Sequence, residues 1–324
     1  MKPLPRRRLL QSAILALGGA PLAAWAQGAY PDRPIKLIVP FPSGALTDAL
    51  GRLVAEQLRP ALGQPLVVMN RPGAGTLLGA SQVAKSPADG YTLMVATSTT
   101  LAISPAMYAT PAAVTSDFVG VAMIGAVSLL LVTRTDMPAR TLPELVAEIR
   151  KQPGRYNFAS PGIGTMHHLV LEMIKAKEDL KATHVPYQGS MGALTDLLSG
   201  RIDFMFLDAV AAMPQVQAGK LRVIALAAPK RSAALPDVPT VAETYPQMDV
   251  YAWQTIAAPR ATPPEIVERL NAEINKLLAT AEMRAALEKV GVAADAMSVP
   301  ALNQLIERDA KRFGDLVRSI GVRA

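Results

Sequence analysis

The sequence contains no cysteine, which excludes several kinds of site at once. Without a thiol the chain has no disulfide, no thiolate metal ligand, no cysteine nucleophile and no cysteine for lipid attachment. Histidine is nearly as scarce, with His167, His168 and His184 as its only three occurrences. Adjacent residues on a helix diverge by about 100°, so His167 and His168 cannot readily chelate one ion. We therefore expect no metal site.

Clustered positive charge is lacking from most of the chain. The formal charge of +7 suggests a nucleic-acid partner at first sight, but Lys2 and Arg6–Arg8 supply four of these charges within the first eight residues. The other Lys and Arg residues are scattered, and aromatic residues make up only 5% of the chain. A nucleic-acid footprint requires clustered basic residues. We therefore expect no nucleic-acid partner.

Apolar runs long enough to span a membrane are also missing. A span needs about 20 residues, and the apolar stretch Leu9–Leu22 is shorter than that. The basic segment Met1–Arg8, the apolar stretch Leu9–Leu22 and the small-residue site Ala24–Ala26 form the pattern of a cleaved secretory signal. The run Arg6–Gln11 also resembles a twin-arginine signal, so the Sec and twin-arginine routes both remain open. We expect residues 1–26 to be removed and the mature protein to be exported to the periplasm.

The mature region alternates β-branched strand patterns with amphipathic helical patterns. This alternation predicts an α/β protein with parallel sheets flanked by helices, and 324 residues suit about two domains. Thr262–Glu265 has the pattern of a capping box that starts a helix to about Ala279. The predicted strands are Ile35–Val39, Leu66–Met69, Tyr91–Ala96, Val119–Ile124, Leu129–Thr133, Tyr156–Ala159, Thr183–Val185, Asp203–Phe206 and Arg222–Ala227.

The apolar run Phe118–Val132 marks the first crossing between two lobes. It is too short for a membrane span, and we expect Gly125 to break it into two buried strands. The proline-rich segment Leu235–Thr240 precedes a return of the chain near Tyr251–Ile256. These features predict a lobe I of residues 27–127 and 251–324 and a lobe II of residues 128–250.

Two segments in different halves of the chain are alike. Ile35–Asp48 and Tyr156–His168 each contain a strand, a glycine-containing loop and a helix start. Such a loop exposes backbone N–H groups beside the positive end of a helix dipole, which favours an anion. In the first loop the candidate donors are Ser43, Gly44, Ala45 and Thr47, and in the second the candidates are Ser160, Gly162, Gly164 and Thr165. The alternative for the first loop is a tight turn in which Thr47 or Asp48 caps the helix.

Three further residues follow predicted strands. His168 lines the cleft, caps the second loop or is an ordinary core or surface histidine, while Tyr187 and Asp208 either contact a ligand or lie on surface loops. Open α/β folds place ligand residues at the carboxyl ends of strands, which is the position of Asp208. Ser160 lacks a Gly-x-Ser-x-Gly context, and no other arrangement of nucleophile and base stands out.

The glycine-rich segment Asn70–Thr76 is a weak candidate for a dinucleotide site. A dinucleotide fingerprint requires an acid near the end of the next strand, and that strand ends in Ala96–Thr99 without one. We therefore expect no nicotinamide cofactor. Arg71 either faces an anion or stabilises the turn.

Motifs along nearly the whole mature chain resemble the solute receptors of tripartite tricarboxylate transporters, the Bug-type periplasmic receptors. The similar stretches are IVPFPSGALTD, NRPGAGTLLGA, SPADGYTLMVA, YNFASPGIGTMHHL, HVPYQG, LLSGRIDFMF, AGKLRVIAL and LPDVPTVAE. The resemblance implies a two-lobed Venus-flytrap fold that holds a small organic acid through backbone groups, often through water. It assigns ligand-binding roles to Phe41, Ser43, Gly44, Thr47, Asp48, Ser160, Gly162, Gly164, Thr165 and His168.

One residue departs from the family pattern, since Ala45 stands where a second glycine is usual. If that position needs a positive φ, Ala45 is strained or the loop is reshaped. Asp208 adds negative charge beside the expected anion, so it either selects a ligand that bears an ammonium group or binds water.

The resemblance implies a monomeric extracytoplasmic binding protein that delivers a small carboxylate to transmembrane transporter subunits. One alternative is a sensor that presents its ligand to a receptor kinase. Another is an exported hydrolase, against which the scarcity of histidine argues.

Overall fold

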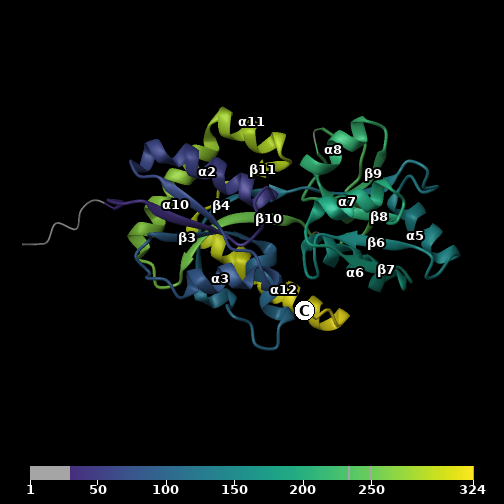
Figure 1. Ribbon diagram of the computed structural model, residues 1–324, viewed down its shortest axis with the longest axis horizontal. Coiled ribbons are helices and arrows are strands. Elements are labelled where there is room, and N and C mark those ends of the chain that lie inside the picture. Colours follow the sequence, from purple (N-terminus) through teal and green to yellow (C-terminus); the bar gives the residue numbers. More distant parts are fainter. Residues whose placement is uncertain (1–29, 233, 249, 324) are drawn as a thin grey trace, which may run out of the picture.

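The computed structural model describes residues 30–323 apart from Ala233 and Asp249, so the predicted signal peptide lies outside the described residues. Figure 1 shows two lobes side by side, each a β-sheet flanked by helices. This architecture confirms the predicted two-lobed α/β fold. Within residues 30–323 as described, no helix combines the length and apolar character needed to cross a membrane.

Lobe I is built on a six-stranded sheet with the order β11-β4-β10-β3-β1-β2. Strand β1 runs parallel to β2 and β3, whereas β10 runs antiparallel to β3 and β4. Its strands are β1 (Ile35–Val39), β2 (Leu66–Asn70), β3 (Thr92–Thr97), β4 (Phe118–Val127), β10 (Ala252–Pro259) and β11 (Val292–Ala294). Its helices are α2 (Leu46–Leu62), η1 (Ala74–Thr76), α3 (Leu77–Ala84), η2 (Thr99–Ile103), α4 (Ser104–Met107), η3 (Thr115–Asp117), α10 (Pro264–Ala279), α11 (Ala281–Lys289) and α12 (Val299–Ile320).

Lobe II is built on a five-stranded sheet with the order β7-β6-β8-β5-β9. Strand β6 runs parallel to β7 and β8, and β5 runs antiparallel to β8 and β9. Its strands are β5 (Leu129–Arg134), β6 (Asn157–Ser160), β7 (Thr183–Pro186), β8 (Phe204–Asp208) and β9 (Leu221–Ala227). Its helices are α5 (Leu142–Lys151), α6 (Met166–Glu178), α7 (Ser190–Leu198), α8 (Ala209–Gln217) and α9 (Val241–Thr244).

The chain passes from the first sheet to the second at Ser128, between β4 and β5. The prediction that Gly125 breaks this apolar run was wrong, because β4 continues through Gly125 to Val127. Gly125 pairs with Gln254 on one side and Ala294 on the other. A Cβ at Gly125 would overlap the carbonyl oxygen of Ala293. The glycine therefore allows β11 to approach closely instead of ending the strand.

Helix α2 shows how the apolar pattern fixes the packing of lobe I. Leu50, Val54 and Leu58 recur every four residues and are almost fully buried, as expected for one face of a helix. Gly51 lets this face approach the sheet, since a Cβ there would lie 3.1 Å from the methyl groups of Val39 and Val95. Each buried Leu contributes roughly 1.5–3 kcal/mol of hydrophobic stabilisation.

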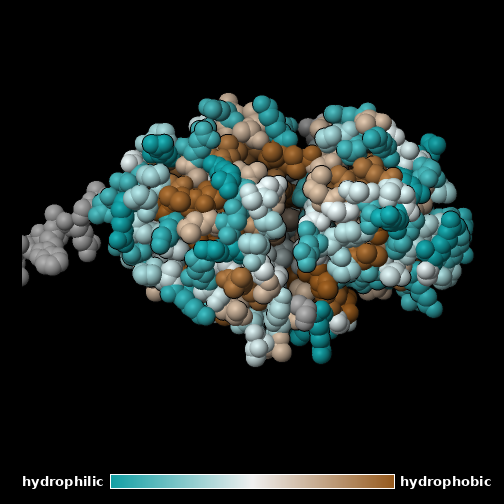
Figure 2. Space-filling model, viewed as in Figure 1, coloured by the Kyte–Doolittle hydropathy of each residue, from teal (hydrophilic) through white to brown (hydrophobic). Residues whose placement is uncertain are grey.

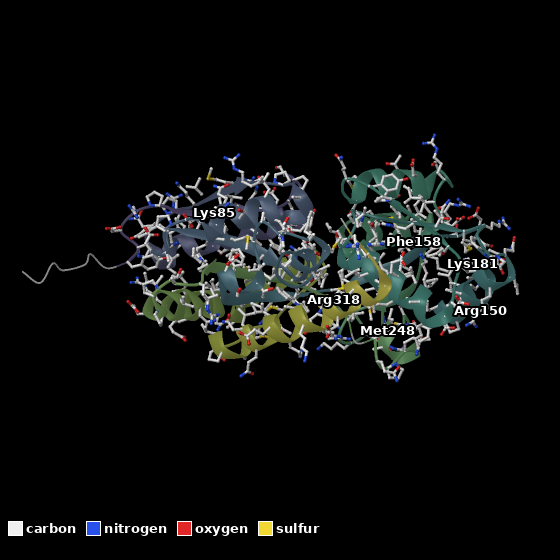
Figure 3. The ribbon with its side chains drawn as sticks, turned by 90° about the horizontal axis from the view of Figure 1, so that it is seen from below. Lys85, Arg150, Phe158, Lys181, Met248 and Arg318 are labelled. Atoms are coloured by element: carbon white, nitrogen blue, oxygen red, sulfur yellow. The ribbon has the colours of Figure 1, made fainter. Side chains whose placement is uncertain are left out.

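Helix α12 connects the two lobes. Figure 3 shows it running along the underside of lobe I and ending against lobe II, where it packs on α6. The indole Nε1 of the buried Trp253 donates a hydrogen bond of 2.9 Å to Asp309 on α12. Because Trp253 lies at the start of β10, this bond ties α12 to the strand by which the chain re-enters lobe I.

The C-terminal part of the fold differs from prediction in two ways. The capping box at Thr262 does not form, because α10 begins at Pro264 after Pro263 and Thr262 Oγ1 finds no partner among the described residues. Helix α11 and strand β11 were not predicted. β11 has only three residues, which is too short for its pattern to stand out in the sequence.

Candidate functional site: the edges facing the interlobe cleft

The two lobes face each other through the carboxyl ends of their parallel strands. Strands β1 to β3 end at this edge in lobe I, and β6 to β8 end at the facing edge of lobe II. Two contacts show that the edges meet: a Cβ on Gly164 would overlap the sulfur of Met107 in lobe I, and a Cβ on Gly291 would meet Ala209 in lobe II. Figure 2 shows the furrow between the lobes.

The loop after β1 adopts its shape without strain at Ala45. Ala45 has φ −69° and ψ 159°, while the positive φ of +83° falls on Gly44. A single glycine is therefore sufficient for the turn, and alanine fits the position where a second glycine is usual. Helix α2 begins at Leu46 with Ala45 as its N-cap residue, so the alternative in which Thr47 or Asp48 caps the helix does not hold, and Asp48 lies in the first turn.

Asp48 holds the first loop together from within. Its carboxylate is 3% exposed and accepts hydrogen bonds from Gly44 N–H at 2.9 Å, Arg52 Nε at 3.2 Å and Asn70 Nδ2 at 2.9 Å. Burial alone would raise the pKa of Asp48, but the hydrogen bonds from Arg52, Gly44 and Asn70 lower it below its ordinary value. With its oxygens occupied by these donors, Asp48 positions the loop instead of facing a ligand.

The first loop leaves several donors available. Ser43 and Gly44 are exposed, and Phe41 is half-buried with its carbonyl oxygen accepting a bond from Asn70. The backbone N–H groups of Ser43, Leu46 and Thr47 find no acceptor among the described residues. Leu46 and Thr47 form the first turn of α2, where unpaired N–H groups favour an anion.

The loop after β6 is built in the same way. Thr165 is the N-cap residue of α6, as predicted for the helix start, and its Oγ1 accepts a bond from His168 N–H. Gly164 has φ +75° and Gly162 has φ +159°. The backbone N–H groups of Ile163, Met166 and His167 find no acceptor among the described residues. The two loops thus present matching sets of donors from opposite lobes.

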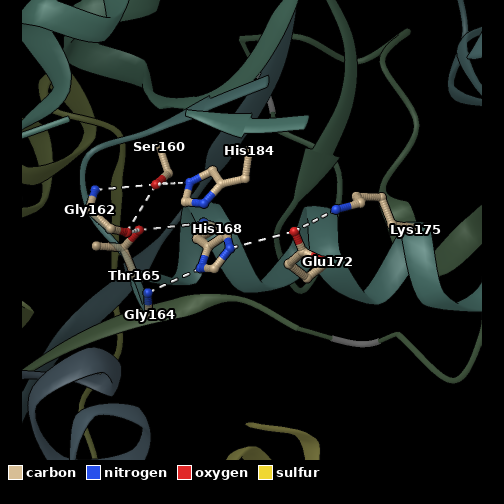
Figure 4. A network of polar contacts seen from close by, with 8 residues as sticks. All are labelled: Ser160, Gly162, Gly164, Thr165, His168, Glu172, Lys175 and His184. Carbon is tan, nitrogen blue, oxygen red and sulfur yellow. Dashed lines mark hydrogen bonds and ion pairs between the residues drawn. The ribbon is translucent and has the colours of Figure 1, made fainter. Parts of the chain in front are cut away.

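Two stacked histidines fix the second loop from behind, as Figure 4 shows. The rings of His168 and His184 stack with centroids 3.8 Å apart. His168 Nδ1 accepts a bond of 3.1 Å from Gly164 N–H, and His184 Nε2 lies 2.7 Å from Ser160 Oγ. Ser160 Oγ in turn donates to the carbonyl oxygen of Gly162 at 3.0 Å. His168 and Ser160 are both buried, so they support the loop from beneath.

Burial favours the neutral form of His184. Glu172 lies 3.6 Å from His168 Nε2 and 2.7 Å from the ammonium group of Lys175. Burial, reinforced by the neighbouring His168, lowers the pKa of His184 to about 4. In the tautomer that carries its proton on Nε2, a neutral His184 donates to Ser160 Oγ and leaves the Ser160 proton for the carbonyl oxygen of Gly162. The sequence offered no spacing signal for this pair, since His184 lies on β7.

The structure places Tyr187 and Asp208 at the same edge but gives both of them partners. The Tyr187 hydroxyl donates a bond of 2.7 Å to Asp196 on α7. Asp208 is the N-cap residue of α8, and its Oδ1 lies 3.4 Å from His167 Nε2. Tyr187 is therefore directed towards its own lobe, whereas Asp208 lies beside His167 Nε2, which has no hydrogen-bond partner among the described residues.

A third loop reaches this edge of lobe I with an unusual backbone. Four successive residues, Gly73–Thr76, have positive φ angles of 130°, 47°, 57° and 81°. Ala74 and Thr76 are not glycines, and such conformations cost of order 1–3 kcal/mol each. Ser104 Oγ donates a bond of 2.6 Å to the carbonyl oxygen of Gly75 and anchors the loop. Arg71, just before it, is exposed and makes no side-chain hydrogen bond within the part of the chain that the structure describes.

Gln254 is a further residue of the edge that sequence reasoning missed. It lies near the start of β10, is 6% exposed, and its Nε2 donates a bond of 3.3 Å to Thr47 Oγ1. Its only sequence signal is a polar side chain within an otherwise apolar strand. In residues 30–323 as described, no group of three His, Asp or Glu side chains is arranged to hold a metal ion.

Comparison with known proteins identifies the family. The pattern described as "Tripartite tricarboxylate transporter family receptor" matches residues 50–322. The chain belongs to this family. It is 36% identical over 300 residues to Protein BugT of Bordetella pertussis, a match that covers 91% of each protein.

Solved structures of this receptor family have the same fold. R. palustris Rpa4515 with adipate is 32% identical with a TM-score of 0.83, and the match covers 91% of this chain and 99% of that one. MatC from Rhodopseudomonas palustris with bound malate is 31% identical with a TM-score of 0.79, and the match covers 89% of this chain and 100% of that one. The chain is thus a periplasmic solute-binding protein of the tripartite tricarboxylate receptor type, as its motifs predict.

Proposed function

We propose that this receptor captures a small carboxylate between its two lobes and delivers it to the membrane subunits of a tripartite tricarboxylate-type transporter. The observation that carries the proposal is the pair of matching donor loops. Each lobe offers unpaired backbone N–H groups at the start of a helix, and α2 and α6 point their positive ends at the same cleft. Two such loops suit an anion held from both sides.

The ligand is held mainly by backbone donors and helix dipoles. The binding residues we propose from the first loop are Phe41, Ser43, Gly44, Ala45 and Thr47, with Asp48 as their support. From lobe II we propose Gly162, Gly164, Thr165 and Asp208, with Ser160, His168 and Tyr187 as support. Helix-terminal charge effects are worth roughly 0.3–2 kcal/mol each, so two loops acting together with hydrogen bonds are sufficient for useful affinity.

The proposal also covers the lobe boundaries, the cellular location and the oligomeric state. We propose residues 27–127 with 251–324 as lobe I and residues 128–250 as lobe II, which agrees with the sheet in which each strand lies. The protein works as a periplasmic monomer after export by its cleaved signal peptide. It acts by binding and release and not by catalysis, because Ser160 and the histidines around it hold a loop in place through their hydrogen bonds.

A thermal-shift panel on the mature protein tests this function. The panel contains monocarboxylates, dicarboxylates, tricarboxylates, amino acids and nicotinate, with the matching neutral amides as controls. Ligand binding to the folded state raises the melting temperature, so we expect at least one carboxylate to raise it while its amide does not. A flat response across all carboxylates would overturn the proposal. Screening purified membrane subunits for binding to the loaded receptor separates transport from a sensory role.

A further inference from the structure

Two buried polar side chains in lobe I have atoms without partners. Gln254 is 6% exposed and Ser98 is 1% exposed, and neither Gln254 Oε1 nor Ser98 Oγ has a hydrogen-bond partner among the described residues. Buried polar atoms are nearly always paired, because an unpaired one costs about 1–3 kcal/mol. Both atoms therefore call for a partner that the described residues do not supply.

The sheet order places these two residues next to the first ligand loop. In the order β10-β3-β1, the end of β3 lies between Gln254 and the loop that follows β1. Gln254 pairs with Thr97, the last residue of β3, and Ser98 follows directly. The bond from Gln254 Nε2 to Thr47 Oγ1 spans this strand end. Ser98 thus follows the strand partner of Gln254 at the base of the lobe I edge.

Their neighbour Thr97 is already occupied. Its Oγ1 accepts a bond from Thr100 N–H at 3.1 Å and shares a second contact with the Thr100 hydroxyl at 3.2 Å. These bonds hold Thr97 within the start of η2. The polar atoms that remain for a ligand at this point are therefore those of Gln254, Ser98 and Thr47.

The side chains of Gln254, Thr47 and Ser98 together offer one hydrogen-bond acceptor and two donors. Gln254 uses its Nε2 on Thr47, so its free Oε1 only accepts. Thr47 Oγ1 accepts that bond, which leaves its own proton to donate, and the hydroxyl of Ser98 also donates. One acceptor beside two donors complements a carboxylate whose adjacent carbon carries a hydroxyl or ammonium group.

We propose that Gln254 is a specificity-determining residue, and that with Thr47 and Ser98 it forms a subsite for 2-hydroxy or 2-amino carboxylates. The inference rests on the proposed carboxylate-capture function and names its substrate class. A hydroxyl or ammonium group on the ligand donates to Gln254 Oε1, and the ligand carboxylate accepts from the two hydroxyls. A carboxylate without such a donor leaves Oε1 buried and unpaired.

Asp208 supplies a second acceptor from the facing lobe. Asp208 pairs with Leu129 on β5, and Gln254 pairs with Gly125 on β4. Leu129 lies four residues after Gly125 in the chain. Four residues of extended chain span at most about 14 Å, so Gln254 and Asp208 flank the same hinge end of the cleft. Among the described residues, Asp208 Oδ1 has only the 3.4 Å contact with His167 Nε2. A negative charge here favours an ammonium over a hydroxyl substituent.

Calorimetry on matched acids tests the proposal. The three sets are propionate, lactate and alanine; succinate, malate and aspartate; and glutarate, 2-hydroxyglutarate and glutamate. Within each set only the group on the carbon beside the carboxylate changes. We expect the wild type to bind the substituted member of at least one set about tenfold more tightly than the plain member, the value of one buried hydrogen bond.

Two variants separate recognition from a structural role. Gln254→Met keeps the side-chain length but removes both polar atoms, so we expect the preference for the substituted acid to fall to within about twofold. Ser98→Ala removes a donor to the carboxylate, so we expect it to weaken all members of a set equally and leave the ratio unchanged. Circular dichroism and melting temperature verify that both variants fold.

The outcomes are distinguishable. If the plain and substituted acids bind wild type equally, or if Gln254→Met leaves their ratio unchanged, the subsite is wrong while carboxylate capture stands. An equal loss for both members in Gln254→Met would show a structural role and also overturn the inference. If none of the nine acids binds, the inference falls, and the wider thermal-shift panel decides the proposed function separately.

Discussion

A substitution at Gly164 tests the contact between the facing edges of lobe I and lobe II. Its φ of +75° lies in the left-handed region, where a Cβ costs about 1 kcal/mol. A Cβ at this position would also overlap the sulfur of Met107, which is 5% exposed in lobe I. Gly164→Ala therefore adds one cost within lobe II and a second cost that exists only while the lobes meet.

The second cost appears in ligand affinity. The backbone strain is present with and without ligand, so it lowers the free energy of unfolding by about 1 kcal/mol and leaves the dissociation constant unaffected. Moving Met107 out of its rotamer costs of order 1 kcal/mol more, and the free protein avoids this cost by opening. Because ligand binding requires closure, we expect Gly164→Ala to weaken binding at least about fivefold.

Gly154→Ala provides the matched control. Gly154 has φ +81°, and a Cβ there would meet nothing within 4 Å. We expect this variant to lose the same backbone stability by thermal denaturation but to keep the wild-type dissociation constant in calorimetry with the tightest-binding carboxylate of the panel. Adding Met107→Ala to Gly164→Ala should restore affinity to that of Met107→Ala alone. Equal affinities of the Gly164→Ala and Gly154→Ala variants would refute the reasoning.

Three further predictions concern the first loop, the histidine pair and the N-terminus. Asp48→Ala leaves Arg52 and Asn70 without their carboxylate, so we expect about 2–4 kcal/mol less stability in urea denaturation and weaker ligand binding, whereas a loss under 1 kcal/mol would contradict the supporting role of Asp48. Folding lowers the pKa of His184 from 6.5 to about 4, so on acidification the unfolded chain takes up the proton before the folded protein does. The contribution of neutral His184 to the free energy of unfolding is therefore fully present above pH 6.5 and is lost as the pH falls towards 4. That loss is at most about 3 kcal/mol, and about half of this for a partly exposed ring; His184→Phe should flatten the dependence, and an unchanged slope would exclude His184 as its source. Intact-mass analysis of the exported protein should show Gln27 as its first residue, and retention of residues 1–26 in the periplasm would contradict the signal assignment.

The fold and the two segments of strand, glycine loop and helix could be predicted because their signals are local. A β-branched run followed by a glycine loop and a helix start identifies β1–α2 and β6–α6 from a few adjacent residues. The predicted strand break at Gly125 was wrong because it, too, was taken from local composition alone. Gly125 has the composition of a strand break, but its small size serves the close approach of β11 from 167 residues further along the chain.

The supporting residues of the site depend on contacts that no local pattern encodes. Asp48 has the position of a helix cap, yet Asn70 from the next strand and Arg52 from the next turn make it the centre of the loop. His184 joins Ser160 only because β7 pairs with β6. Gln254 meets Thr47 across 207 residues of sequence. Each of these pairings is set by sheet order, which periodicity does not determine.

The proposed function requires one ligand to be held by loops from both lobes. Hydrogen–deuterium exchange measures the protection of both loops most directly. Mature protein is compared with and without the tightest-binding carboxylate of the panel. We predict slower exchange at the N–H groups of residues 43–47 in lobe I and residues 162–167 in lobe II, with the same dependence on ligand concentration. Protection confined to one of the two loops, or placed elsewhere on the protein at saturation, would contradict the account.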